Sequence, residues 1–338
     1  MILKDTKKLE LSYIPQKILC RDEEIKRLKI FVEGGKAVIS GGVGTGKTML
    51  ARYIGGDAYI NCFMNKTEHR VLEEILRQLN PKFNPAGLPT QKLWSKVEGG
   101  KRIILDEIDG MNIDELKHFA YTLSRQYEVG KKIDYIAITR NHFILKQLIN
   151  DDAIWSTFAG NSIVELKPYT WEQIKEILES RAKEGISAKA YDDEIISLIA
   201  DIALHSPGHM RTAIDLLRNS ALIAESRGFE KINPDDVREA NREEWISDLE
   251  SMEKKELLVF MATAFSCKNK AYANTDEIKD VLKIKEEEYG IKLSENDFER
   301  IFQLLVQQDF IYEGKKGYTI LNYPIKTLIE EIHERIKR

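Results

Sequence analysis

The sequence has few of the residues that build metal cages and disulfide frameworks. Among its 338 residues are three cysteines, Cys20, Cys62 and Cys267, and six scattered histidines. The cysteines lie far apart and form no CxxC pair. Neither a zinc site nor a disulfide framework is therefore predicted.

Long apolar runs and an excess of positive charge are also missing. No stretch approaches the roughly 20 apolar residues that cross a bilayer. The opening, MILKDTKKLELSY, lacks the long apolar centre of a secretory signal. We therefore expect a soluble, cytoplasmic protein that does not contact membranes. Because the formal net charge is −4, any contact with nucleic acid must come from local basic patches.

Short apolar runs mark the first half of the chain. Five of them alternate with amphipathic helical stretches: KAVIS (36–40), AYINC (58–62), RIILD (102–106), YIAIT (135–139) and SIVEL (162–166). Continuous apolar strands suit a parallel sheet that helices cover on both faces. Residues 1–167, which include an N-terminal arm, are therefore predicted to form an α/β base domain.

Helical patterns dominate the rest of the chain. Residues 168–250 are predicted to form a small helical domain that opens with a capping box between Thr170 and Gln173. Residues 251–338 contain three helical stretches and then two short strands, FIYEG and GYTIL. Three helices followed by a hairpin is the order of a winged helix, a DNA-binding variant of the helix-turn-helix.

The segment SGGVGTGKTMLARYIGG (40–56) carries a phosphate-binding pattern. Gly41, Gly46, Lys47 and Thr48 fit G-x-x-x-x-G-K-[ST] between a predicted strand and a predicted helix. Backbone N–H groups at a helix start cradle phosphates, the lysine reaches the terminal ones, and the threonine hydroxyl ligates Mg²⁺. We therefore predict binding of ATP or ADP with Mg²⁺. The predicted contacts are Gly44, Thr45, Gly46, Lys47, Thr48 and Met49.

Two adjacent acids follow the third apolar run. In RIILDEID, Asp106 ends a buried strand, where it can hold Mg²⁺ together with Thr48. Glu107 is placed to polarise an attacking water as a general base. The pair is therefore predicted to supply the metal ligand and the catalytic carboxylate.

These motifs together resemble an AAA+ ATPase. More narrowly, the chain is similar over nearly its whole length to the archaeal origin-recognition/cell-division-control (ORC/Cdc6-type) replication initiators. The resemblance implies an AAA+ P-loop parallel sheet, a helical lid and a C-terminal winged helix. The matching stretches are YIPQKILCRDEEIKRL, YINC, LDEID, YTLSRQ, KPYTWEQIKEILESR and GHMRTAIDLLRNSALIAE.

The resemblance also implies further nucleotide contacts. Tyr169 and Arg181 match nucleotide-binding positions at the lid entrance, where a ring can pack on adenine and a guanidinium can reach polar edges. Arg211 matches the second sensor, a lid cation that meets the terminal phosphate. Ile14 and Pro15 match an arm that closes over the base, although a plain hydrophobic staple has the same pattern.

The first sensor is a polar residue at the end of the fourth strand. It falls in ITRNH, where the register leaves Thr139, Arg140 and Asn141 open, and we take Thr139 and Asn141 as the catalytic candidates. One departure from the family is clear. The family usually carries an arginine soon after this strand, facing a neighbour's ATP, but no arginine occurs from residue 141 to residue 161.

The predicted winged helix offers a small set of DNA contacts. On its third helix Arg300 and Gln303, with Asn296, can reach bases or phosphates, but three acids on the same helix would repel phosphate. The wing presents Lys315 and Lys316, which a generic solvated hairpin would also carry. The resemblance further implies DNA contacts between the second and third strands, where Lys92 is a candidate.

The function that these features favour is an ATP-binding replication initiator that contacts double-stranded origin DNA, with slow hydrolysis acting as a conformational switch. A replicative helicase or other initiator subunits are possible partners, and we expect a monomer or weak oligomer. One alternative is a winged-helix AAA+ regulator of transcription or of protein partners. The other is a ring motor similar to branch-migration helicases, against which the absent arginine speaks.

We predict that the purified chain hydrolyses ATP slowly in the absence of partners. An arginine supplied to the γ-phosphate contributes a factor of roughly 10³ to 10⁵ in rate, and this chain lacks the one its family usually supplies. Steady-state release of phosphate measures the rate. Turnover of several ATP molecules per second without a partner would contradict the prediction.

Overall fold

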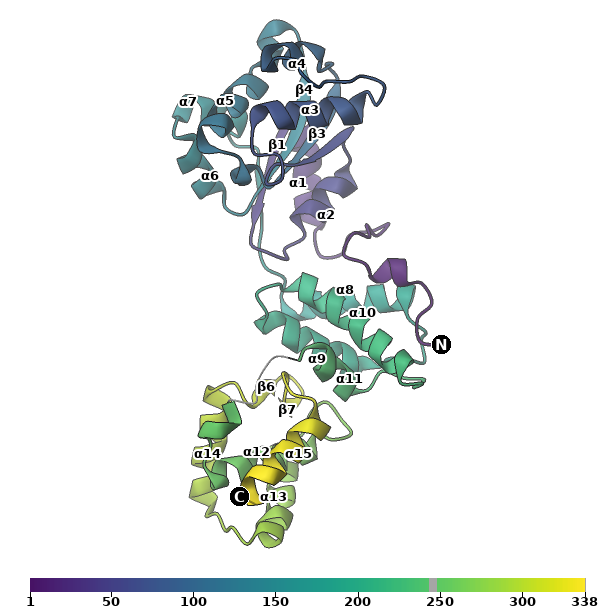
Figure 1. Ribbon diagram of the computed structural model, residues 1–338, viewed down its shortest axis with the longest axis vertical. Coiled ribbons are helices and arrows are strands. Elements are labelled where there is room, and N and C mark those ends of the chain that lie inside the picture. The colour runs from purple at the N-terminus through teal and green to yellow at the C-terminus, as the bar shows by residue number, and fades with distance from the viewer. Residues whose placement is uncertain (243–247, 338) are drawn as a thin grey trace. The chain divides into compact units, whose positions relative to one another are not determined.

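The computed structural model describes residues 1–242 and 248–337. The chain divides into two compact units, Ile14–Tyr169 and the combination of Met1–Tyr13 with Thr170–Arg338 (Figure 1). Up to Tyr13 the N-terminal arm therefore groups with the second unit, and the division into three domains stays a prediction. Residues 243–247, which we assign to the helical domain, and the final residue, Arg338, lie outside the described residues.

The first unit contains a five-stranded sheet in the order β2-β3-β4-β1-β5. Every neighbouring pair is parallel, so the predicted fold class is confirmed. The five predicted strands are all present, with bounds within two residues of the apolar runs. They are β1 (Lys36–Gly41), β2 (Ala58–Asn61), β3 (Lys101–Asp106), β4 (Ile133–Thr139) and β5 (Ile163–Leu166).

Helices cover both faces of this sheet because successive strand residues point to opposite sides. Ile39, Ile104 and Ile138 pack with α1 and α2, whereas Val38, Leu105 and Ala137 pack with the helices of the other face. The helices of this unit are α1 (Asp22–Glu33), α2 (Lys47–Ile54), α3 (Glu68–Leu79), α4 (Thr90–Lys96), α5 (Ile113–Ser124), α6 (His142–Ile149) and α7 (Asp152–Phe158).

The second unit begins with four helices that correspond to the predicted lid. Thr170 and Gln173 form the expected capping box at the start of the first. The N-terminal arm, with a 3₁₀ turn at Thr6–Leu9, packs on these helices, since Leu3 pairs with Ile186. The four helices are α8 (Trp171–Gly185), α9 (Asp193–His205), α10 (Met210–Ser226) and α11 (Pro234–Ala240).

The rest of this unit is a winged helix. Three helices precede the hairpin as predicted, and they share one apolar core. A final helix, α15, was not predicted, although Ile325, Leu328, Ile332 and Ile336 recur at helical spacing and are buried. The elements are α12 (Lys254–Ser266), α13 (Thr275–Tyr289), α14 (Glu295–Gln307), β6 (Tyr312–Gly314), β7 (Gly317–Thr319) and α15 (Ile325–Lys337).

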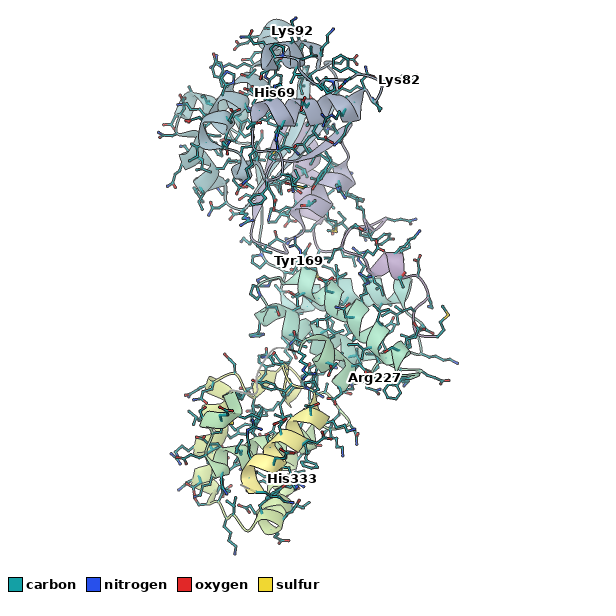
Figure 2. The ribbon with its side chains drawn as sticks, in the orientation of Figure 1. His69, Lys82, Lys92, Tyr169, Arg227 and His333 are labelled. Atoms are coloured by element: carbon teal, nitrogen blue, oxygen red, sulfur yellow. The ribbon has the colours of Figure 1, made fainter. Side chains whose placement is uncertain are left out.

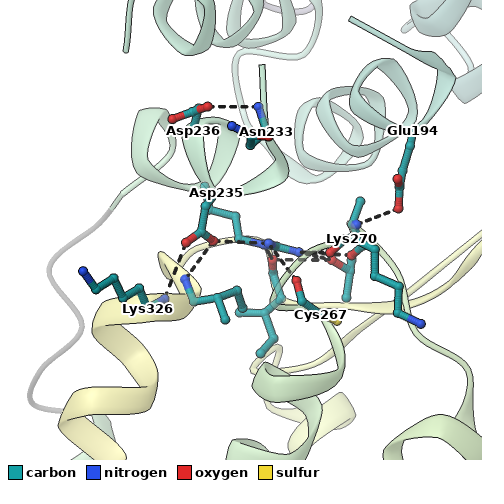
Figure 3. Close-up of polar contacts among 12 residues, drawn as sticks. Glu194, Asn233, Asp235, Asp236, Cys267, Lys270 and Lys326 are labelled. Atoms are coloured by element: carbon teal, nitrogen blue, oxygen red, sulfur yellow. Dashed lines mark hydrogen bonds and ion pairs between the residues drawn. The ribbon is translucent and has the colours of Figure 1, made fainter. Parts of the chain in front are cut away.

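A buried arginine joins the lid to the winged helix. Arg238 of α11 has no exposed surface, and its guanidinium donates to the backbone oxygens of Ile320 (2.8 Å) and Ala271 (3.1 Å). Asp235, one turn earlier, pairs with Arg238 at 3.3 Å and accepts the backbone N–H of Ile325 at the start of α15 (Figure 3). A desolvated cation is tolerated here because several oxygens surround it.

Replacing Arg238 by alanine is expected to lower the free energy of unfolding by about 3 kcal/mol, because buried carbonyl oxygens lose a charged donor. Arg242, which follows the same helix and pairs with Glu239 at the surface, provides the control. Its alanine variant should change stability by less than about 0.5 kcal/mol. Urea unfolding of both variants measures the difference, and equal losses would contradict a special role for the buried guanidinium.

Candidate functional site

The loop between β1 and α2 folds around left-handed glycines. Gly44 and Gly46 have φ angles of 73° and 87°, and Gly46 immediately precedes α2. A Cβ atom at Gly46 would lie 3.0 Å from the hydroxyl of Tyr169, so both the backbone angle and the space favour glycine. The loop therefore leaves the N-terminal N–H groups of an eight-residue helix directed at an anion-binding position.

Lys47 lies over this loop. Its ammonium group donates to the backbone oxygens of Gly41 (2.6 Å) and Gly42 (2.7 Å). Thr45 is buried, and its hydroxyl also donates to the Gly42 oxygen, at 3.0 Å. The predicted phosphate contacts of Gly44 to Met49 thus lie in the loop and the first turn of α2, where the positive charge of Lys47 meets the helix start.

Oxygen ligands meet beside the same helix. The Thr48 hydroxyl donates to Oδ2 of Asp106 at 2.8 Å, and the Tyr59 hydroxyl donates to the same oxygen at 2.6 Å. Burial, and then the neighbouring Asp106 carboxylate, raise the pKa of Tyr59 above its usual value. The hydroxyl of Thr48 and the carboxylate of Asp106 are hard oxygen donors of the kind that Mg²⁺ prefers, so the predicted metal pair fits that ion.

Glu107 follows Asp106 in a strained conformation. Its φ angle is 52°, which is uncommon for a residue with a side chain. The Asn61 amide donates to Oε2 of Glu107 at 3.2 Å, and Arg140 lies 3.9 Å from Oε1. The carboxylate predicted to act as the base is thus held by the ends of two other strands. Neither Asn61 nor this contact of Arg140 was predicted.

The structure separates the three candidates for the first sensor. Thr139 is buried at the end of β4, and its hydroxyl donates to Asp109 at 3.0 Å. The Asn141 side chain accepts the backbone N–H of Phe143 at 2.8 Å and so caps α6. Only Arg140 of the three is shown in contact with Glu107. The sensor roles of Thr139 and Asn141 stay predictions.

Tyr169 lies beside the phosphate loop, because a Cβ atom at Gly46 would be 3.0 Å from its hydroxyl. It is buried, and the guanidinium of Arg21 stacks on its ring at 4.0 Å. Arg21 also donates to the backbone oxygens of Lys167 (2.6 Å) and Thr45 (3.3 Å). Its buried Nε has no hydrogen-bond partner in the described part of the chain. Sequence reasoning missed Arg21, although it lies within a quoted family stretch, CRDEEI.

Other kinds of site find no support in the described residues. Within residues 1–242 and 248–337, no group of three or more His, Cys, Asp and Glu side chains could hold a metal ion. No helix in those same ranges is both long and apolar enough to span a membrane. Cys20, Cys62 and Cys267, all of which lie within the described residues, form no disulfide bond there.

Comparisons with known proteins find several relatives of this chain. The family profile of the Cdc6 AAA+ ATPase-type lid domain matches residues 175–242. An ORC1-type DNA replication protein 1 of Sulfolobus acidocaldarius is 29% identical over 306 residues, covering 80% of this chain and 75% of that protein. The ORC1-type DNA replication protein 1 of Sulfurisphaera tokodaii is 32% identical over 259 residues. The match covers 69% of this chain and 64% of that protein.

The chain belongs to the ORC1/Cdc6 family. Solved structures agree in fold: Cdc6p from Pyrobaculum aerophilum matches with a TM-score of 0.87 at 24% identity, covering 100% of this chain and 99% of that one. Aeropyrum pernix ORC1, solved in complex with DNA, matches with a TM-score of 0.62 at 22% identity and 99% coverage of both chains. The fold is that of an AAA+ ATPase with a lid and a winged helix.

The lid residues expected in this family have local partners. Arg181 is buried, and it donates to the backbone oxygens of Lys8 and Tyr13, each at 3.0 Å, with its guanidinium over the Tyr13 ring. Burial lowers the pKa of Arg181. Arg181 therefore anchors the N-terminal arm, whereas its nucleotide contact stays a prediction. Ile14 and Pro15 follow at once and are half-buried.

Arg211 lies exposed in the first turn of α10. The residue at the cap, His209, has a φ angle of 44° and a ψ angle of −117°, a strained combination. Its buried Nδ1 has no hydrogen-bond partner among the residues that the structure describes. Strain of this kind is found at functional positions. The role of Arg211 as second sensor stays a prediction.

The winged helix of this ORC1/Cdc6 member presents one polar row on α14. Asn296, Arg300 and Gln303 are exposed one turn apart, and the Arg300 side chain is 76% exposed. The acids that were expected to repel phosphate form ion pairs with lysines of the same domain at its surface. Lys279 pairs with Glu295 at 3.2 Å and with Glu299 at 2.9 Å, and Lys255 pairs with Asp297 at 3.3 Å.

The other predicted DNA contacts divide into two cases. Lys92 on α4 is exposed (Figure 2). Lys315 and Lys316 of the wing instead pair with Glu172 and Asp193 of the lid. All of these DNA contacts stay predictions.

The substitution Arg21→Ala is expected to lower the free energy of unfolding by about 3 kcal/mol, because two hydrogen bonds to backbone carbonyl oxygens and the stacking on Tyr169 are lost. Arg27, which lies six residues later on α1, donates to the backbone oxygen of Ile163 from an exposed position and provides a matched control. Its alanine variant should lose less than about 1 kcal/mol. Denaturant unfolding checks both, and a loss at Arg21 no larger than at Arg27 would contradict the assignment.

Proposed function

We propose that this chain is an ATP-binding DNA replication initiator, which contacts origin DNA through its winged helix and its AAA+ base domain. The observation that carries the ATP part is the bond between Thr48 and Asp106, which joins the phosphate loop to the end of β3. The DNA part is supported by the exposed polar row on α14. It is also supported by the names of the relatives, which are DNA replication proteins, and by a similar fold solved with DNA.

The bound group in this proposal is ATP or ADP with Mg²⁺. The α2 N-terminus and Lys47 bind and orient the phosphates, while Thr48 and Asp106 hold the ion, which supplies neutralisation of phosphate charge. Tyr59 keeps one oxygen of Asp106 in place. Glu107 accepts the proton of the attacking water, and the Asn61 amide orients its carboxylate before that step.

Hydrolysis in this proposal is slow and serves as a switch. Asn61 and Arg140 contact the two carboxylate oxygens of Glu107. Glu107 can act as a base only when one of these contacts breaks, or when the contacts direct a carboxylate oxygen toward the attacking water. Arg211 senses the terminal phosphate from the lid, and Tyr169 and Arg181, with Ile14 and Pro15, surround the base. Nucleotide state would thereby set the conformation of the lid and the winged helix attached to it.

Membership of the ORC1/Cdc6 family favours the initiator over the ring motor and over a regulator that never touches DNA. We infer that double-stranded DNA is the principal partner. A replicative helicase and other initiator subunits are further partners in this proposal, and a monomer or weak oligomer in the cytoplasm is its expected state.

A Lys47→Ala variant should bind a fluorescent ATP analogue about 100-fold more weakly, because a cation that contacts phosphate is lost from a preformed loop. Lys101→Ala, which removes a half-buried lysine from β3 of the same unit, is the control and should bind like the parent protein. Equal affinity of the Lys47 variant and the parent would contradict the phosphate site.

Duplex binding should weaken steeply as the salt concentration rises. Arg300→Ala should make the slope of log affinity against log salt concentration shallower by the equivalent of about one phosphate contact. Fluorescence anisotropy with a labelled duplex, at several salt concentrations and with ATP or ADP, measures this. Lys283→Ala, an exposed lysine on the neighbouring α13, is the control. Absence of salt-dependent binding with either nucleotide would remove DNA from the proposed function.

A further inference from the structure

The two wing lysines contact an acidic edge of the lid. Lys315 forms an ion pair with Glu172, and Lys316 forms one with Asp193. The ammonium group of Lys315 also lies 4.8 Å from the centre of the Trp171 ring. We call Trp171, Glu172 and Asp193 the lid ledge. Both cations that the sequence offers at the wing tip are therefore paired with this ledge.

The wing strand fits closely against the lid behind these pairs. A Cβ atom at Gly314 would lie 2.6 Å from Oδ2 of Asp201 and 3.0 Å from the Tyr272 ring. Asp201 is buried, and it accepts hydrogen bonds from the Trp171 indole, at 2.6 Å, and from the Tyr272 hydroxyl. Tyr312 packs edge-on against His205, with ring centres 4.6 Å apart. The docking thus involves the wing backbone as well as its lysines.

The ion pairs themselves are of the kind that breaks easily. The side chains of Lys315 and Glu172 are 52% and 63% exposed, and those of Lys316 and Asp193 are 34% and 57% exposed. Exposed pairs are weak and screened by salt. The junction of lid and winged helix rests instead on buried Arg238. The lysines can therefore leave the ledge without separating the two parts.

We propose that the lid ledge competes with duplex DNA for the wing, with the carboxylates of Glu172 and Asp193 occupying the cations that would otherwise meet phosphates. This inference rests on the proposed DNA-binding function. In this proposal the docked wing is a resting state in which the chain has a reduced affinity for duplex DNA. Any movement that shifts α8 and the start of α9 away from the hairpin would release two phosphate contacts at once.

The test begins with Glu172→Gln/Asp193→Asn in the full-length chain, measured by anisotropy of a labelled duplex across a salt series. We expect binding about tenfold tighter than that of the parent, with a salt slope steeper by up to about two contacts. The same pair of substitutions is then combined with Lys315→Ala/Lys316→Ala. The gain should disappear in that combination, because it depends on the released lysines.

Two further variants separate release of the wing from a general loss of negative charge. Glu179→Gln/Glu230→Gln removes the same charge elsewhere on the lid and should leave duplex affinity within about twofold of the parent. Gly314→Ala changes no charge but pushes the wing strand off Asp201, so it should tighten binding as the ledge variant does. Hydrogen exchange of residues 312–319 reports the docking directly, and it should speed up in the ledge variant and in Gly314→Ala.

The outcomes are distinct. Parent-like affinity of a ledge variant whose hairpin exchanges faster would overturn the competition, as would a gain that survives loss of both lysines. Unchanged exchange of the hairpin would overturn the docking itself. If the parent and every variant fail to bind duplex with salt dependence, the proposed function fails, and hydrogen exchange still decides whether the ledge holds the wing.

Discussion

The parallel direction of all five strands is the constraint on which the nucleotide site depends. Parallel strands bring their carboxyl ends to one edge of the sheet, and the order β2-β3-β4-β1-β5 places β4 between β3 and β1 there. Gly41, Asn61, Asp106 and Thr139 each end a strand at that edge. Residues that are distant in sequence thus meet because of the strand arrangement, although no sequence motif joins them. The bond from Thr48 to Asp106 and the one from Asn61 to Glu107 are its direct results.

Charged side chains in this protein follow two different rules. Arg21, Arg181 and Arg238 are all buried, and each points its guanidinium at backbone oxygens from a segment far away in sequence. Such contacts are costly to leave unpaired, so they tie the joined segments firmly together. The wing lysines instead pair with carboxylates at the surface, where water and salt can replace the partner. The lid and winged helix therefore share a firm junction and a weak, exchangeable contact.

Much of the fold was predictable because local patterns and tertiary environment agree. The five apolar runs became the five strands, and the helical stretches from residue 170 to residue 308 became the lid and the three helices of the winged helix. The helix α15 was missed because its apolar positions, read alone, follow a hairpin that seemed to complete the motif. Its spacing was visible in the sequence, and only the core of the winged helix shows what it packs against.

The sequence by itself determined the phosphate loop, the Asp106–Glu107 pair and the strands that these two motifs follow. Each of them depends on short spacings that a single stretch of backbone can satisfy. Tertiary structure alone decided that Arg140 contacts Glu107 whereas Asn141 caps a helix, that Arg21 stacks on Tyr169, and that the wing lysines lie on lid carboxylates. The physical reason is that each of these contacts joins side chains whose separation depends on how strands and helices pack. Residue type reports the capacity to form an ion pair, and only packing selects the partner.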